Sequence, residues 1–155
     1  MSRAKQVYLN YWKQLKFFVD ELGLDWTFSS FEAESQIVVK IGAPKHKICL
    51  SLQGPDGKGV RSISAGFWIP DSRETFARLQ ARSKELAAEI GQPLWWDSRP
   101  GRKSCWIWVT VSMDLSQEKN WPASFEWFAK NATRLRDVVQ QHLESMQIAL
   151  LKNPG

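Results

Sequence analysis

The sequence has 155 residues, of which 43% are hydrophobic and 24% charged, and it carries a net charge of +5. These proportions are ordinary for a folded soluble protein, and the length suits one domain covering residues 1–155. They exclude a membrane-spanning protein, because no apolar run approaches the roughly 18 residues that cross a bilayer. The N-terminus also lacks a signal-peptide core, so we expect a cytoplasmic protein with no membrane partner.

The first stretch with a clear period is residues 5–22. Its apolar side chains recur every three or four positions and form one stripe, made of Tyr8, Trp12, Leu15, Val19 and Leu22. Gly23 follows directly and is typical of a helix end. The pattern predicts an amphipathic helix whose aromatic stripe is buried in the core.

Three strands are predicted next, over residues 36–41, 46–53 and 60–69. The second and third alternate between apolar and polar residues, as strands with one buried face do. Glycine- and proline-containing turns separate all three. Residues 25–34 connect the first helix to this sheet, with room for one further short strand.

A capped helix is predicted over residues 72–90. Asp71 and Glu74 resemble a capping box for a helix that starts near Ser72. Gly91 is the expected left-handed stop. This helix leads into the Trp-rich part of the chain.

A strand pair follows that helix, over residues 95–96 and 104–112, with a polar, basic tip at residues 97–103. In the second strand, Trp106 and Trp108 share one face, while the opposite face also carries bulky side chains. The strand is therefore either central in the sheet or part of an aromatic outer surface.

The last helix begins at Trp121, with Pro122 at a tolerated first-turn position, and runs to about Leu150. Arg134 and Arg136 fall outside its apolar stripe, so this helix is a candidate docking surface for a partner domain. The elements follow the order α-β-β-β-α-β-β-α. They predict a single α+β domain whose antiparallel sheet of about five strands has helices packed on one face.

Motifs for catalysis or cofactor binding are missing from the sequence. No Cys-x-x-Cys pair and no helical histidine pair supports a metal site, since His46 and His142 lie in unrelated elements. Phosphate-loop and nucleophile-elbow patterns are missing too. Cys49 and Cys105 lie in apolar runs, so we expect free thiols, with a disulfide as the alternative. We therefore expect no catalytic residue, no metal and no cofactor.

A metal-dependent nuclease is the enzymatic alternative. Residues 55–58 read Pro-Asp-Gly-Lys, and Glu32 and Glu34 are conceivable partners for the aspartate. Such chemistry needs several carboxylates that converge on Mg²⁺ beside a lysine. Pro-Asp-Gly, however, is also an ordinary turn sequence with its own backbone reason.

Positive charge is concentrated in two segments of the chain. Residues 40–61 hold five basic residues and one acidic residue, and residues 97–103 hold three basic residues and one acidic residue. Basic loops beside strand tryptophans predict a nucleic-acid platform, because lysine and arginine contact phosphates and indoles stack on bases. Its candidate residues are Lys45, Lys47, Lys58, Arg61, Trp96, Arg99, Arg102, Lys103, Trp106 and Trp108. The alternative is that the lysines keep the sheet edges soluble and the tryptophans are core.

Several segments resemble a bacterial domain of unknown function that is often found C-terminal to restriction-endonuclease-like nuclease domains. They include Tyr11-Trp12, Phe76-x-x-Leu79 into residues 85–89, Ile90-Gly91-x-x-Leu94-x-Trp96, the basic hairpin, Trp106-Ile107 and Trp127-Phe128. The resembling residues cover most of the chain, and most are packing residues and caps. The resemblance therefore implies a fold more than a mechanism, and the family offers no agreed catalytic residues.

The resemblance also implies a context of DNA restriction, phage defence or mobile elements. The first hypothesis is a non-catalytic accessory module that binds DNA or associates with a separate nuclease or defence protein. The alternative is a protein-interaction or dimerisation module, a possible homo-oligomer that does not contact nucleic acid. Since no nuclease domain precedes the matching segments, we expect the domain to act alone, as an oligomer or with a separately encoded nuclease.

Overall fold

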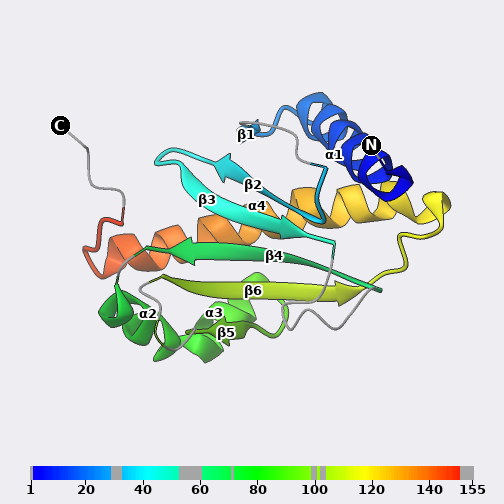
Figure 1. The fold of residues 1–155 in the computed structure, drawn as a ribbon. Coiled ribbons are helices and arrows are strands. Elements are labelled where there is room, and N and C mark those ends of the chain that lie inside the picture. The colour runs from blue at the N-terminus through cyan, green and yellow to red at the C-terminus, as the bar shows by residue number, and fades with distance from the viewer. Residues whose placement is uncertain are drawn as a thin grey trace.

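The computed structural model describes residues 2–28, 33–52, 61–70, 72–98, 101 and 104–150. The described strands form one sheet, and the long last helix runs along one face of it (Figure 1). In chain order they are α1 (Arg3–Glu21), β1 (Trp26–Phe28), β2 (Gln36–Ile41), β3 (His46–Ser51), β4 (Ser62–Ile69), α2 (Arg73–Gln80), α3 (Ser83–Ile90), β5 (Trp95–Asp97), β6 (Cys105–Ser112), the 3-10 turn η1 (Glu118–Asn120) and α4 (Trp121–Ser145).

The sheet has six strands in the order β1-β2-β3-β4-β6-β5, and all neighbours are antiparallel. The predicted α+β class and antiparallel sheet are confirmed. The sheet has six strands where about five were expected, because Trp26–Phe28 pairs with β2 as an additional edge strand. Three residues are too few to show the alternation by which a strand is recognised in a sequence.

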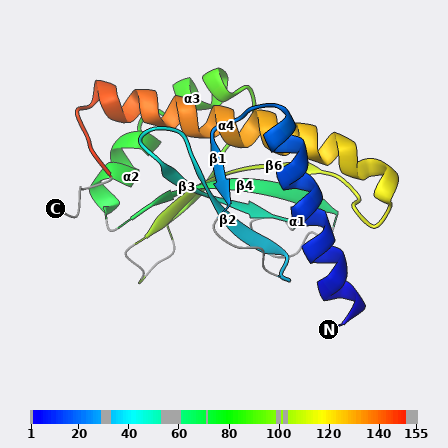
Figure 2. The same cartoon turned by 90° about the horizontal axis from the view of Figure 1, so that it is seen from above.

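One face of the sheet carries the core. The strand residues on this face are mostly β-branched or aromatic, and α4 runs along them (Figure 2). In β2 and β3 they are Ile37, Val39, Ile41, Ile48 and Leu50, and in β4 and β6 they are Ile63, Ala65, Phe67, Ile69, Ile107 and Val109, all at most 3% exposed. Burial of this continuous apolar layer is the main stabilising contribution to the fold.

The predicted central helix is divided in two. α2 ends at Gln80 and α3 begins at Ser83, because Arg82 N–H bonds to Leu79 O in a tighter turn. The Ser72 hydroxyl accepts a hydrogen bond from Thr75 N–H at 3.1 Å and caps α2, whereas Asp71 lies outside the described residues. Gly91 has a φ of +90°, so the predicted left-handed stop is confirmed.

The last helix, α4, contains a buried arginine. Arg136 is 8% exposed, and its guanidinium donates from Nε to Ile41 O at 3.1 Å and from Nη2 to Pro44 O at 2.5 Å. The sequence-based view of Arg136 as part of an outer docking surface is therefore wrong. Arg134, by contrast, is exposed as expected. The helix ends at Ser145, about one turn before the expected end.

Helix α1 packs against the start of α4. The Ser124 hydroxyl donates its one hydrogen to Trp121 O at 2.6 Å. It therefore accepts a hydrogen bond from the Tyr11 hydroxyl, at 2.7 Å. Burial raises the pKa of Tyr11 well above its ordinary value, so its phenol stays protonated at neutral pH. The predicted burial of the α1 stripe is confirmed for Trp12, Leu15 and Val19, while Leu22 is 55% exposed.

Both cysteines are buried free thiols, Cys49 in β3 and Cys105 in β6. Burial raises the pKa of the Cys105 thiol, which disfavours the reactive thiolate. Among the helices that the structure describes, none combines the length and apolar character that crossing a membrane requires.

Candidate nucleic-acid interface

The sheet face opposite the helices, called here the open face, carries the clearest group of charged and aromatic side chains. Strand register places these residues in transverse rows. One row runs through Thr27, Lys40, Lys47, Trp68, Trp106 and Asp97, and the next through Val38, Cys49, Gly66, Trp108 and Trp95. The open face therefore has a basic side on β2 and β3 and an aromatic side on β4, β6 and β5.

Three lysines, called here the lysine cluster, gather on the basic side: Lys40, Lys45 and Lys47. Lys40 and Lys47 are exposed and directly opposite each other on β2 and β3. Lys45 Nζ donates to Thr27 Oγ1 at 3.4 Å, and Thr27 is itself the β1 partner of Lys40. Like charges directly opposite in a sheet cost stability. An anion placed between the lysines would remove that cost.

The turn that carries Lys45 is fixed from inside the protein. Gly42 has a φ of +87°, and a side chain there would meet the Arg136 guanidinium. Arg136 in turn bonds to the carbonyls that flank Gly42, Ile41 O and Pro44 O. Lys45 thus projects from a turn whose backbone is held by the core helix α4.

Four tryptophans, called here the indole cluster, form the aromatic side: Trp68, Trp95, Trp106 and Trp108. Lys47 Nζ lies 4.6 Å from the centre of the Trp68 ring, a cation–π contact that joins the two sides. Trp106 and Trp108 stack with centroids 5.3 Å apart and planes at 23°. Trp95, directly opposite Trp108 on β5, is 45% exposed.

Gly66 allows the indole of Trp108 to pack directly on the sheet. A Cβ at this position would lie 2.6 Å from Trp108 Cε3 and 2.7 Å from Trp108 Cδ2. The indole of Trp108 therefore lies directly over the β4 backbone, and only glycine leaves room for it.

We expect Gly66→Ala to lower the free energy of unfolding by about 1 to 3 kcal/mol, because the new methyl group must displace the Trp108 ring. Urea unfolding of Gly66→Ala, Trp108→Val and the double variant checks this as a double-mutant cycle. In the Trp108→Val background the alanine should cost much less. An equal cost in both backgrounds would show that the ring is not what the methyl group meets.

One polar atom in the indole cluster has no hydrogen-bond partner among the residues that the structure describes. Trp108 is 5% exposed, and no described residue accepts a hydrogen bond from its Nε1. A buried donor without an acceptor costs about 1 to 3 kcal/mol. Because the atom is sealed from solvent, this cost belongs to the packing of Trp108 over the sheet.

The structure brings together some of the residues predicted from the sequence and separates others. Lys45, Lys47, Trp106 and Trp108 share the open face, although Trp108 is largely covered. Trp96 lies on the helix-covered face, where its ring meets Phe76 edge-on at 5.5 Å. Lys58, Arg99, Arg102 and Lys103 lie outside the described residues.

Arg61 lies away from the lysine cluster. It precedes β4, whereas Lys45 adjoins the other end of that strand, about 25 Å away at 3.3 Å per residue. Its charge acts on Asp114, whose pKa is lowered first by hydrogen bonds from the Ser116 hydroxyl and amide and then by Arg61. Arg61 therefore does not extend the basic side of the open face.

Sequence reasoning left three open-face residues out of the candidate set: Lys40, Trp68 and Trp95. The tight turn after Ile41 sets the hairpin register, and this register alone would have placed Lys40 opposite Lys47. No comparable signal in the sequence shows which of Trp95 and Trp96 lies on the open face. Both are large and adjacent in a strand of three residues.

The described residues give little support to a metal site or to an enzymatic reaction. They contain no group of three or more histidine, cysteine, aspartate or glutamate side chains that could hold a metal ion. Glu32 and the Pro-Asp-Gly-Lys segment at residues 55–58 lie outside them. His142 Nε2 meets Glu89 Oε2 at 2.7 Å, and Arg82 Nη1 lies 3.2 Å from His142 Nδ1, so this histidine ties α3 to α4.

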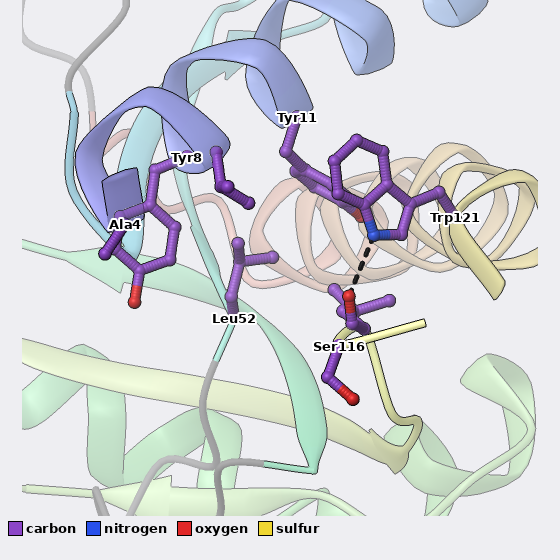
Figure 3. A pocket seen from close by; sticks show the side chains of 8 residues that line it. Ala4, Tyr8, Tyr11, Leu52, Ser116 and Trp121 are labelled. Atoms are coloured by element: carbon purple, nitrogen blue, oxygen red, sulfur yellow. Dashed lines mark hydrogen bonds between the residues drawn. The ribbon is translucent and has the colours of Figure 1, made fainter. Parts of the chain in front are cut away.

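A separate pocket of about 270 Å³ lies between the start of α1 and the start of α4 (Figure 3). Its wall is mainly apolar, with Tyr8 and Leu52 on one side and Trp121 on the other. Two of its polar groups are already paired, since Trp121 Nε1 donates to Leu115 O at 2.9 Å and Tyr11 donates to Ser124. The pocket therefore offers a mainly apolar surface.

Comparisons with known proteins agree with this architecture. The profile of a family described as a domain of unknown function (DUF4268) matches residues 7–143. A crystal structure described as "YbjN, a putative transcription regulator from E. coli" is similar over 90% of this chain and 95% of its own, with 14% identity and a TM-score of 0.52. Such a likeness shows the fold alone. No curated protein has significant sequence similarity to the chain.

Proposed function

The chain belongs to the DUF4268 family of domains of unknown function, and we propose that it is a non-catalytic module that binds nucleic acid across its open face. The observation that carries this proposal is the lysine cluster beside the indole cluster, joined by the contact of Lys47 with Trp68. Ammonium groups contact phosphates and indoles stack on bases, so one face offers both kinds of contact.

The burial pattern supports a ligand on this face. Lys40 and Lys47 are exposed and paired like with like, and Val38 and Trp95 are 43% and 45% exposed on the same face. Helix α4 packs on the opposite face, so it leaves these side chains uncovered. A face with unfavourable charge pairing and exposed apolar area gains free energy when an anionic, partly aromatic ligand covers it.

We extend the proposal to a cellular setting. The domain would serve as an accessory reader or scaffold for a nuclease in DNA restriction, phage defence or mobile elements. This setting follows from the sequence resemblance to domains that accompany nucleases. In such a complex the reader holds the nucleic acid while a separate protein supplies the catalytic carboxylates and metal.

A protein-interaction role is the second candidate. The observation in its favour is Phe17, which is 69% exposed on α1 beside a shallow hollow lined by Phe18, Pro122 and Phe125. A large exposed aromatic side chain next to an apolar hollow is typical of a contact surface. The surface around Phe17 belongs to helices, so a protein bound there would not cover the open face.

Removal of the lysine cluster tests the proposal. We expect Lys40→Gln, Lys45→Gln and Lys47→Gln in one variant to weaken binding and to lower the slope of log affinity against log salt by about 2, because about 0.7 counterions are released for each phosphate contact on a single strand. Fluorescence anisotropy of a labelled oligonucleotide over a range of salt concentrations measures both quantities.

The matched control removes three exposed lysines from helical positions, through Lys84→Gln, Lys119→Gln and Lys130→Gln. Both triple variants change the net charge by the same amount, so a general charge effect would weaken them equally. Such an equal loss, or an absence of binding by the wild-type protein at low salt, would contradict the proposal. The Phe17 surface would then become the better candidate.

A further inference from the structure

We infer that the open face selects single-stranded nucleic acid, with phosphates on the lysine cluster and one unpaired base stacked on Trp95. The inference rests on the proposed function. It adds the form of the nucleic acid and the place of the base to that function.

The place for a base is a hollow on β5 and β6. This hollow has a volume of about 380 Å³ and lies at the β5 edge of the sheet, where it is lined by Pro93, Leu94, Trp95, Trp96 and Thr110. Trp95 is the most exposed described tryptophan, at 45%. A flat indole at the edge of an apolar hollow suits one planar ring, because a base can stack on the indole while its edge stays accessible.

The charges on the open face indicate how the bound nucleic-acid strand lies across the sheet. The lysine cluster lies on β2, β3 and their turn, whereas Asp97 lies on the same face of β5, opposite Trp106. β3 and β5 are three strand spacings apart, about 14 Å at roughly 4.8 Å each. Phosphates are attracted to the lysine side. A strand that crosses the sheet therefore places phosphates over β2 and β3 and the base of a later nucleotide on Trp95 at β5.

A duplex cannot make the same set of contacts. The flat faces of its bases are covered by neighbouring base pairs, so the indoles would have nothing to stack on. The described open face also presents a broad sheet, whereas readers of the major groove insert a helix or a two-stranded ribbon. A duplex would keep only the phosphate contacts of the lysine cluster, and these contacts do not depend on Trp95.

Anisotropy titrations with a labelled single strand of about 16 nucleotides and with the same strand annealed to its complement test the inference. We expect the wild-type protein to bind the single strand more tightly. Trp95→Ala should weaken single-strand binding by about 5- to 150-fold, the equivalent of one stacked base, and leave duplex binding unchanged. A deoxythymidine and a uridine oligomer of equal length distinguish DNA from RNA as the source of the strand.

Two controls separate stacking from loss of structure. Phe17→Ala removes another exposed aromatic side chain, on α1, and should leave both affinities unchanged. Trp95→Phe keeps a flat ring and should retain part of the single-strand preference. Circular dichroism of each variant checks that the fold is kept.

The outcomes distinguish this inference from the proposed function. Equal affinity for the two forms, insensitive to Trp95→Ala but reduced by the triple lysine change, would overturn the inference and leave the proposed function in place. No binding to either form by the wild-type protein would overturn both. A single-strand preference that disappears in Trp95→Ala supports both.

Discussion

The Trp12→Ala variant should lose about 4 kcal/mol of folding stability. Trp12 is fully buried, packs edge-on against Tyr11 at 5.1 Å and lies 6.4 Å from the Phe128 ring. Its Nε1 donates to Glu34 O at 2.9 Å, so the variant also leaves that carbonyl without its partner. The substitution removes the largest side chain that is completely buried in the core.

Such a loss is a large share of the total for a domain, which typically has about 5 to 15 kcal/mol of stability. Urea denaturation followed by circular dichroism measures it. The matched control is Phe17→Ala on the same helix, where the side chain is 69% exposed and the expected change is within about 0.5 kcal/mol. Similar losses in the two variants would show that α1 is not held by its buried stripe.

Arg136→Met should lower the free energy of unfolding by about 3 kcal/mol. The guanidinium makes two charge-assisted hydrogen bonds to carbonyls at the β2–β3 turn, and each such bond contributes about 1.5 to 3 kcal/mol. Methionine fills much of the same volume but leaves Ile41 O and Pro44 O unsatisfied. The turn that presents Lys45 should lose its fixed backbone, so nucleic-acid affinity should fall as well.

Arg134→Met provides the control for Arg136→Met. Arg134 lies on the same helix, is exposed, and reaches Ile90 O only at 3.5 Å. Chemical denaturation and oligonucleotide titration of the two variants give the comparison directly. If both variants lose stability equally, or if Arg136→Met is as stable as the wild type, the guanidinium does not hold the turn.

Much of the fold could be predicted from the sequence because its signals are local and repeated. The strands predicted over residues 46–53 and 60–69 alternate between apolar and polar residues, and Gly91 ends its helix as its lack of a side chain permits. Pro122 lies in the first turn of α4, where its missing N–H costs nothing. Each of these features depends on neighbours within a few positions.

The features that escaped prediction depend on distant parts of the chain. Arg136 is buried because carbonyls from a turn far away in the sequence accept its hydrogen bonds. The break after Gln80 carries neither glycine nor proline, so tertiary packing sets it rather than local propensity. The same holds for the candidate site, since which of Trp95 and Trp96 faces outward depends on the register with β6.

The pairing of the first helix with the last constrains the order in which the protein can form during synthesis. The aromatic stripe of α1 meets Trp121, Phe125 and Phe128 of α4, about a hundred residues later. At about 5 to 20 residues per second, a ribosome needs on the order of 5 to 20 s to make that interval. Through this time the nascent chain carries Tyr11 and Trp12 without their final partners. The domain can therefore complete its core only after its last helix has emerged from the ribosome.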